Sequence, residues 1–224
     1  MDLSFGGDLL AVEGISVVTT TWNEAENIGK LISAVKEVLK GCPHEVIVVD
    51  DSSSDGTFEV AQSVADVAVS KKREGQAKGL LHGMKLAKYP VIVTIDSDLE
   101  NDPKHIPRLL ELIRQFDVVV ASRNTIPRIS ERFASKTLGK MLGVTDTFSN
   151  FRAFRKETVA LFNLEAGETF GAEFLVIAKR RKLRIGELFY DPPERRKNPR
   201  IGGNVKANLR IFWAAFKSAM VYLF

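Results

Sequence analysis

The sequence predicts an α/β domain in which helices flank a mostly parallel central sheet. Apolar runs of strand length alternate with segments of helix length through the first half of the chain. Polar clusters follow these runs, as expected where ligands bind beyond the carboxyl ends of parallel strands. The 224 residues are 45% hydrophobic and 27% charged. This composition indicates an ordinary globular protein and excludes collagen, low-complexity and generally disordered chains.

The expected elements start with the apolar run Ile15–Thr20 as a strand and the amphipathic pattern Glu24–Lys40 as a helix. Pro103 suits the first turn of a later helix, where a residue's N–H has no intrahelical partner. Strands that alternate with helices pair in parallel through right-handed crossovers. The remaining strands are expected at Glu45–Val49, Val67–Ser70, Val91–Ile95 and Val118–Ala121, and the helices at Thr57–Ala65, Gln76–Lys88 and Pro103–Gln115.

The second half of the chain has a less regular pattern. A helix is expected at Gly167–Lys182 and a strand at Arg184–Tyr190, and a loop rich in Pro, Gly and Arg follows at Asp191–Gly203. We find no internal repeat and no linker that would separate two domains. Residues 1–206 are therefore expected to form one domain.

Residues 207–224, ANLRIFWAAFKSAMVYLF, are apolar apart from a few positions, with Arg210 and Lys217 as the charges. A spanning helix needs about 20 predominantly apolar residues, and a central charge is costly. The segment is better suited to an amphipathic helix at a membrane surface. A helix docked on the protein core is the alternative. The first 13 residues do not resemble a secretory signal, because they lack a basic region.

The net charge of +4 hides two halves of opposite sign. Residues 1–100 contain 9 Lys and Arg against 16 Asp and Glu, whereas residues 101–224 contain 23 against 12. This asymmetry indicates a charged partner. A nucleic acid is disfavoured, because it would leave the carboxylate clusters of the first half unexplained. The single cysteine, Cys42, excludes an internal disulfide and a cysteine-based zinc site.

Carboxylate clusters follow two of the expected strands. Asp96, Asp98 and Glu100 alternate along the chain, and alternate residues of an extended segment point the same way. Hard divalent cations such as Mg²⁺ take oxygen ligands and would neutralise this cluster. Asp50 and Asp51 end another strand, where a carboxylate could accept hydrogen bonds from a base edge or a ribose hydroxyl. The alternative is that both clusters are polar loops that cap the next helices.

Three motifs follow the expected strands in order: VVTTTWNEAENI, VVDDSSSDGT and TIDSDLENDP. Together with ASRN, FSNFRAFRKE and RIGGNVK, they resemble the inverting nucleotide-sugar glycosyltransferases of the GT-A fold. Within that group the sequence is most similar to the polyprenol-phosphate (dolichol-phosphate) mannose synthases, on the strength of Ser149–Arg155 and Gly171–Phe174. The resemblance covers about residues 15–206 and implies a GT-A type, Rossmann-like domain.

The resemblance also implies a role for each matching residue. The nucleotide sugar would be bound by Thr20, Trp22, Glu24, Val49, Asp50, Asp51, Lys78, Asp96, Ser97 and Asp98. A divalent metal, Mg²⁺ or Mn²⁺, would be ligated by Asp96, Asp98 and Glu100. Donor and acceptor phosphates would be bound by Arg123, Arg132, Arg200 and Lys206. Asp98, Arg123 and Glu173 would take part in catalysis, with Glu173 orienting the acceptor or the sugar.

The sequence departs from the family pattern at a few of these positions. Thr20 and Trp22 stand where the family usually has Pro and Tyr, and Trp22 retains a ring that can stack on a base. Glu100 stands where the mannose synthases usually have Gln, and its carboxylate can still ligate a metal. Val205 replaces the usual Ser before Lys206, so Arg195 or Arg196 could take the place of the late basic pair.

The activity implied by the resemblance is transfer of mannose from GDP-mannose to a polyprenol phosphate with inversion, on the cytoplasmic face of a membrane. The basic second half would then meet phosphates and anionic lipid. A second possibility keeps the fold and changes the donor to UDP-glucose, or the acceptor to a sugar hydroxyl of a polysaccharide or glycolipid. A third is a non-catalytic module that binds nucleotide sugars or membranes.

Overall fold

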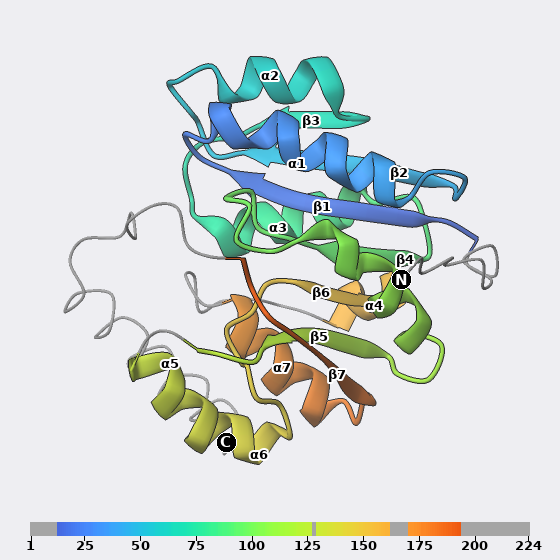
Figure 1. The fold of residues 1–224 in the computed structure, drawn as a ribbon, viewed down its shortest axis with the longest axis vertical. Coiled ribbons are helices and arrows are strands. Elements are labelled where there is room, and N and C mark those ends of the chain that lie inside the picture. The colour runs from blue at the N-terminus through green and yellow to red at the C-terminus, as the bar shows by residue number, and fades with distance from the viewer. Residues whose placement is uncertain (1–12, 127–128, 162–169, 194–224) are drawn as a thin grey trace.

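The computed structural model describes residues 13–126, 129–161 and 170–193. In this part of the chain, the strands form one sheet in the order β3-β2-β1-β4-β6-β5-β7 (Figure 1). The strands are β1 (Ile15–Thr21), β2 (His44–Asp50), β3 (Val67–Ser70), β4 (Val91–Thr94), β5 (Val118–Arg123), β6 (Arg152–Arg155) and β7 (Ile185–Tyr190).

Helices connect the strands and cover both faces of the sheet. The longer ones are α1 (Ala25–Val38), α2 (Thr57–Val64), α3 (Gln76–Leu86), α4 (Ile106–Leu112) and α7 (Phe170–Arg180). The short helices α5 (Ile129–Ala134) and α6 (Lys140–Leu142) are joined by the π-helical turn η3 (Ser135–Gly139). The 3₁₀ turns η2 (Pro103–His105) and η4 (Lys156–Leu161) lie before α4 and after β6.

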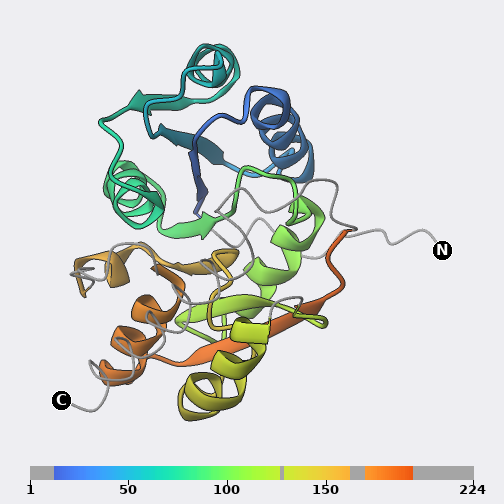
Figure 2. The same cartoon turned by 90° about the vertical axis from the view of Figure 1, so that its left-hand side faces the viewer.

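The core consists of two apolar layers, one on each face of the sheet. Side chains of α1, α2 and α4 pack on one face, and side chains of α3, α6 and α7 pack on the other. In Figure 2, α1 and α4 accordingly lie on one side of the sheet and α3 and α7 on the other. Most of the strands are rich in apolar residues, as expected for a mostly parallel sheet that is covered on both faces.

The predicted strands and helices of the first half are confirmed, with boundaries that move by a few residues. The helix expected at Pro103–Gln115 is divided into η2 and α4, which ends at Leu112. The helix expected at Gly167–Lys182 is described from Phe170 to Arg180 as α7, and the strand expected at Arg184–Tyr190 is β7. The mostly parallel α/β sheet is therefore confirmed.

Two features of the second half were not predicted. Strand β6 lies between β4 and β5 and runs antiparallel to both. Its sequence, Arg-Ala-Phe-Arg, has a charge at each end, and so it lacks the apolar run that marks the other strands. The segment from Ile129 to Leu142 is helical, but it consists of three short pieces with a π-helical turn in the middle, which gives no regular 3.6-residue pattern.

The expected division into residues 1–206 and 207–224 stays a prediction, since residues 194–224 lie outside the described part. Among the helices that the structure describes, none has the length and apolar character needed to cross a bilayer.

Candidate active site

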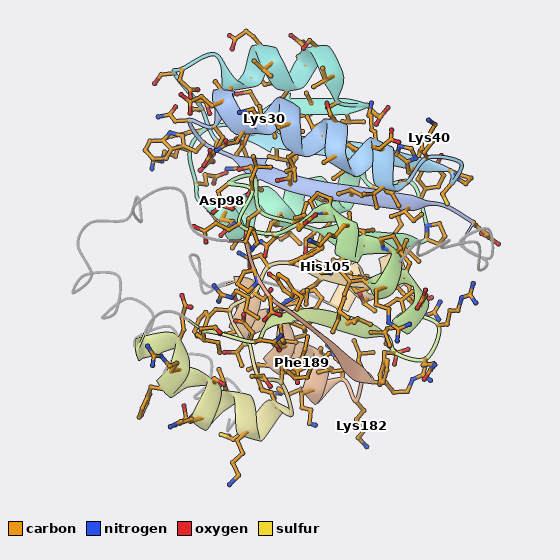
Figure 3. All side chains as sticks on the ribbon, in the orientation of Figure 1. Lys30, Lys40, Asp98, His105, Lys182 and Phe189 are labelled. Atoms are coloured by element: carbon orange, nitrogen blue, oxygen red, sulfur yellow. The ribbon has the colours of Figure 1, made fainter. Side chains whose placement is uncertain are left out.

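The carboxyl ends of β1, β2 and β4 meet at one edge of the sheet, because these strands pair in parallel. The loop after each strand contains a non-glycine residue in the left-handed region: Asn23 (φ 54°), Ser52 (φ 60°) and Leu99 (φ 63°). Unusual backbone conformations of this kind concentrate at functional sites. Asp98 lies at this edge (Figure 3). The edge is therefore the candidate active site.

Asp96 is held in place by three side-chain amides. Gln76 Nε2 and Asn150 Nδ2 donate to Asp96 Oδ1 at 2.6 Å and 3.2 Å, and Asn101 Nδ2 donates to Oδ2 at 3.2 Å. The hydroxyl of Tyr190, at the end of β7, donates in turn to Asn101. Desolvation raises the pKa of Asp96, although the hydrogen bonds from Asn150 and Gln76 oppose it. The carboxylate is thus fixed by three amides, and Tyr190 in turn holds one of them, Asn101, in place.

Asp98 is the second carboxylate of the pair and is exposed. It accepts a hydrogen bond from the backbone N–H of Glu100 at 3.0 Å. Although the residue reaches solvent, the protein atoms around its carboxylate remove much of the water there. This loss of water, and then the charge of Asp96, raise the pKa of Asp98 to about 7. The charges of Glu100 and Glu24 act in the same direction. The structure therefore brings the predicted residues Asp96, Asp98 and Glu100 together, and it adds Glu24 from the loop after β1.

This group of carboxylates fits a hard divalent cation whose coordination is completed by a substrate. In the described part of the chain, no three His, Cys, Asp or Glu side chains are arranged to ligate one metal ion. The mutually repelling Asp96 and Asp98 nevertheless supply oxygen donors, and Mg²⁺ is commonly bound by one or two carboxylates plus phosphate oxygens. These two residues would hold the cation. The role of Glu100 as a ligand stays a prediction.

Asp51 anchors the segment that connects β3 to α3. Lys71 Nζ and the backbone N–H of Glu74 donate to its Oδ1 at 2.6 Å and 3.0 Å, and the N–H of Gly75 donates to its Oδ2 at 2.9 Å. Burial acts to raise the pKa of Asp51, but these hydrogen bonds outweigh it and hold the pKa below its ordinary value. Asp51 therefore shapes the loop beside it, and its expected contact with a base stays a prediction.

The other residues expected to bind the nucleotide sugar lie at or just after the ends of β1, β2 and β4, and in the first turn of α3. Asp50 is buried and accepts hydrogen bonds from the backbone N–H and the hydroxyl of Ser53, which closes the loop after β2. The guanidinium carbon of Arg73 lies 3.4 Å from the centroid of the Trp22 ring. Asp50 and Trp22 are therefore both ordered by local contacts. Thr20, Val49 and Ser97 are buried, and Lys78 is exposed in an ion pair on α3.

Arg123, at the end of β5, is paired with two carboxylates of its own chain. Its Nε and Nη2 donate to Asp146 at 2.6 Å and 3.2 Å, and its Nη2 also donates to Glu131 at 3.1 Å. Burial acts to lower the pKa of Arg123, but these two carboxylates raise it above its ordinary value. Within the described residues, no acceptor is bonded to Nη1. The two N–H groups of Nη1 can donate to a phosphate, and this role of Arg123 stays a prediction.

Arg152 is a cation buried behind the site. Its Nη1 donates to the carbonyl of Gly171 at 2.8 Å and its Nη2 to the carbonyl of Thr147 at 3.0 Å, whereas its Nε has no partner in the described part. The guanidinium also lies over the ring of Phe174, 5.3 Å from its centroid. Complete burial lowers the pKa of Arg152 to about 9. Arg152 thus joins β6 to α7 and to the segment that carries Asp146.

The remaining predicted residues lie on helices α5 and α7 or outside the described part of the chain. Glu173 is buried in the first turn of α7, and Arg132 is exposed on α5. Arg200 and Lys206 lie outside the described residues, so their expected contacts with phosphate stay predictions.

Comparison with known proteins assigns the family. The family model described as glycosyl transferase family 2 matches residues 16–183. The chain belongs to glycosyl transferase family 2. Among curated relatives, a dolichol-phosphate mannosyltransferase of Pyrococcus furiosus is 32% identical over 165 residues, which are 65% of this chain and 47% of the relative. An undecaprenyl-phosphate 4-deoxy-4-formamido-L-arabinose transferase of Pectobacterium carotovorum is 33% identical over 177 residues, which are 71% of this chain and 54% of the relative. The chain thus spans about half the length of these relatives.

Solved structures of the same type confirm the GT-A fold. Glucosyl-3-phosphoglycerate synthase of Mycobacterium tuberculosis, in complex with Mn²⁺, UDP and glucosyl-3-phosphoglycerate, has a TM-score of 0.76 at 19% identity over 95% of this chain and 80% of that one. Mannosyl-3-phosphoglycerate synthase of Rubrobacter xylanophilus has a TM-score of 0.72 at 17% identity, and the match covers 96% of this chain and 74% of that one. Identities this low support the fold alone.

Several residues of the family 2 site were not identified from the sequence. They are the three amides around Asp96 (Gln76, Asn101 and Asn150), the partners of Arg123 (Glu131 and Asp146), and Lys71, Arg73 and Arg152. A signal was present for some of them. Asn150 and Arg152 fall within the FSNFRAFRKE motif and Asn101 within TIDSDLENDP, and Arg73 and Gln76 fall within the basic, glycine-containing run Arg73–Gly79. Lys71, Glu131 and Asp146 are brought to the site by the fold from positions without a local pattern.

Proposed function

We propose that the chain is the catalytic domain of an inverting glycosyltransferase that transfers mannose from GDP-mannose to a polyprenol phosphate. The observation that carries this proposal is the carboxylate group at the edge of the sheet, where Asp96 lies beside Asp98 and close enough to the guanidinium of Arg123 to interact with its charge. This arrangement combines a cation site with a phosphate-binding cation, as a nucleotide diphosphate requires. The names of two relatives, a dolichol-phosphate and an undecaprenyl-phosphate transferase, support the lipid phosphate as acceptor.

In the proposed reaction, an oxygen of the acceptor phosphate attacks the anomeric carbon of the sugar in line. The new carbon–oxygen bond forms as the bond between that carbon and the donor diphosphate breaks, and the nucleoside diphosphate leaves. A phosphate is already ionised near neutral pH, so the attack needs no general base. The product is a lipid phosphosugar with inverted, β configuration.

Asp96 and Asp98 would hold Mg²⁺ or Mn²⁺, which when bound would neutralise charge on the leaving diphosphate. The amides around Asp96 keep its carboxylate oriented. Arg123 offers its Nη1 to a phosphate while Asp146 and Glu131 fix its position. Arg132, Arg200 and Lys206 are proposed to bind the remaining phosphate oxygens.

On the donor side, Trp22 and Asp51 are proposed to contact the base, supported by their place beside the loop between β3 and α3. On the acceptor side, Glu173 is proposed to orient the acceptor or the sugar from the first turn of α7. We place the reaction at the cytoplasmic face of a membrane, with residues 207–224 as an interfacial segment. If the acceptor were instead a sugar hydroxyl, Glu173 would act as its base.

The experiment is a radiolabelled donor screen that compares GDP-mannose with UDP-glucose, with a short polyprenyl phosphate as acceptor and Mn²⁺ present. We expect mannose transfer, its loss in Asp98→Ala and upon addition of EDTA, and unchanged transfer in Glu37→Ala, an exposed acid of α1. Glu173→Gln should weaken the reaction without abolishing it. Transfer to a sugar hydroxyl in place of the lipid phosphate, abolished in Glu173→Gln, would overturn the proposed acceptor.

A further inference from the structure

Tyr190, the last residue of β7, is a buried tyrosine whose hydroxyl is directed toward the carboxylates after β4. The residue is 3% exposed, and its hydroxyl donates to Asn101 Oδ1. Asn101 is 7% exposed and donates from Nδ2 to Asp96 Oδ2 at 3.2 Å. A single amide therefore connects the end of β7 to a carboxylate that is proposed to hold the cation.

The end of β7 lies at this edge of the sheet because of the strand directions. Strands β4 and β5 are both antiparallel to β6, which lies between them, and β7 is parallel to β5. The carboxyl ends of β4, β5 and β7 therefore share one edge. Neighbouring strands are about 4.8 Å apart, so β7 lies roughly 14 Å from β4 across the sheet. Tyr190 and Asn101 together bridge this distance, which is more than one tyrosine side chain spans.

The ring of Tyr190 is held by packing, and its backbone is held by the sheet. The ring of Phe151 meets it edge-on with 6.2 Å between the centroids, and the ring of His105 lies at 4.9 Å. In the ladder between β5 and β7, Tyr190 is in register with Arg123, and its carbonyl accepts from the N–H of Asn124 at 2.9 Å. The hydroxyl therefore sits at the end of a side chain that has little freedom to move.

The chemistry of the three groups sets the orientation of the Asn101 amide. An ionised carboxylate only accepts hydrogen bonds, so the amide turns its NH₂ group toward Asp96. The amide oxygen then faces Tyr190, whose hydroxyl donates to it. A buried hydroxyl or amide oxygen without a partner is costly, and this arrangement satisfies both. The contact with Tyr190 therefore opposes any rotation of Asn101 away from Asp96.

We propose that Tyr190 is a positioning residue for the cation site. Its hydroxyl keeps Asn101 in the orientation that donates to Asp96, and this keeps the carboxylate in place for a divalent cation. Because Tyr190 is in register with Arg123, the same contact fixes Asp96 relative to the guanidinium that is expected to bind a phosphate. The proposal rests on the proposed function in one respect, namely that Asp96 holds the cation.

The test measures Mn²⁺ binding to the full chain from the electron paramagnetic resonance signal of the free ion, with no substrate present. We expect the affinity to fall about tenfold in Asn101→Ala. It should fall about fivefold in Tyr190→Phe, which keeps the packing of the ring and removes one hydrogen bond. The matched control is Tyr89→Phe, because Tyr89 lies just before β4, at the opposite edge of the sheet. This variant should bind Mn²⁺ as the wild type does.

The double variant Tyr190→Phe/Asn101→Ala separates positioning from a general loosening of the fold. If Tyr190 acts through Asn101, the double variant should bind Mn²⁺ as Asn101→Ala does, because the hydroxyl has no amide left to orient. A further fivefold loss in the double variant would overturn the proposal, and so would an unchanged affinity in Tyr190→Phe. If Tyr190→Phe does not fold, Asn101→Ala decides, and an unchanged affinity in that variant would overturn the proposal.

The transfer assay distinguishes failure of this proposal from failure of the proposed function. In Tyr190→Phe, the Mn²⁺ concentration for half-maximal mannose transfer should rise about fivefold, with a smaller change in the rate at saturating Mn²⁺. Transfer that requires Mn²⁺ without this rise would overturn the role of Tyr190 and leave the proposed function standing. If no mannose is transferred, the proposed function fails, and the binding measurement still decides the role of Tyr190.

Discussion

Removing the charge of Asp98 should stabilise the metal-free protein. The pKa of this carboxyl is raised from 3.8 to about 7, by loss of water and by the neighbouring Asp96. Between these two pH values the folded protein keeps a proton that the unfolded chain has released, so stability falls as the pH rises through this window. Above pH 7 the full loss is present. The Asp98→Asn variant has no carboxyl group to ionise, so it should not lose stability in this way.

The size of the effect follows from the pKa difference and the exposure of the side chain. A difference of about three pKa units corresponds to about 4 kcal/mol at 1.36 kcal/mol per unit. Asp98 is exposed, and solvent screening reduces such a value to about 1–2 kcal/mol. For a domain of this size, that is a rise in melting temperature of about 3–6 °C at pH 8.

The assay is thermal unfolding in EDTA at pH 4 and pH 8, for the wild type and two variants. Asp98→Asn should gain stability over the wild type at pH 8 and little at pH 4. The matched control is Asp117→Asn, because an ion pair with Arg184 at 2.9 Å lowers the pKa of Asp117. That variant should lose stability at pH 8. If Asp98→Asn is less stable than the wild type at pH 8, this would refute the view that the carboxylates repel one another when no cation is bound.

Further variants test the packing and the second layer of the site. Asn150→Ala removes an amide that orients Asp96 and should weaken Mn²⁺ binding about tenfold in calorimetry; an unchanged affinity would contradict this role. Arg152→Ala should lower the free energy of unfolding in urea by about 3 kcal/mol, because it leaves a cavity and two carbonyls without their donors; a loss under 1 kcal/mol would count against it. Gly83→Ala should cost about 1–3 kcal/mol, since a Cβ there lies 2.5 Å from a side chain of β1. Gly29→Ala, with its nearest neighbour at 3.4 Å, should instead gain up to about 1 kcal/mol of helix propensity. The reverse order would refute the packing argument.

The parts of the fold that could be predicted are those with a local pattern. Strands β1, β2 and β4 are apolar runs that end in polar clusters, so both the strands and their shared edge follow from the sequence. Strand β6 does not, because Arg152 is completely buried although its charge suggests the surface. Its burial depends on the carbonyls of Thr147 and Gly171, and the sequence does not reveal that the fold brings them together.

The same distinction applies to the candidate site. Asp96, Asp98 and Glu100 could be placed together because they follow a single strand. Arg123 was expected as a phosphate ligand, and that role stays a prediction, but its pairing with Asp146 and Glu131 is set by tertiary structure. The helical segment 129–142 was likewise not predicted, since its short pieces and π-helical turn match neither the α-helical nor the strand pattern.

The most direct test of the central claim is the transfer assay with purified full chain, radiolabelled GDP-mannose and a short polyprenyl phosphate. The carboxylates Asp96 and Asp98 are proposed to hold the cation that this reaction needs. We predict a mannosyl phospholipid whose formation requires Mn²⁺ or Mg²⁺ and is lost in Asp98→Ala, while Glu37→Ala retains it. Full transfer by Asp98→Ala, or transfer undiminished in EDTA, would contradict the account.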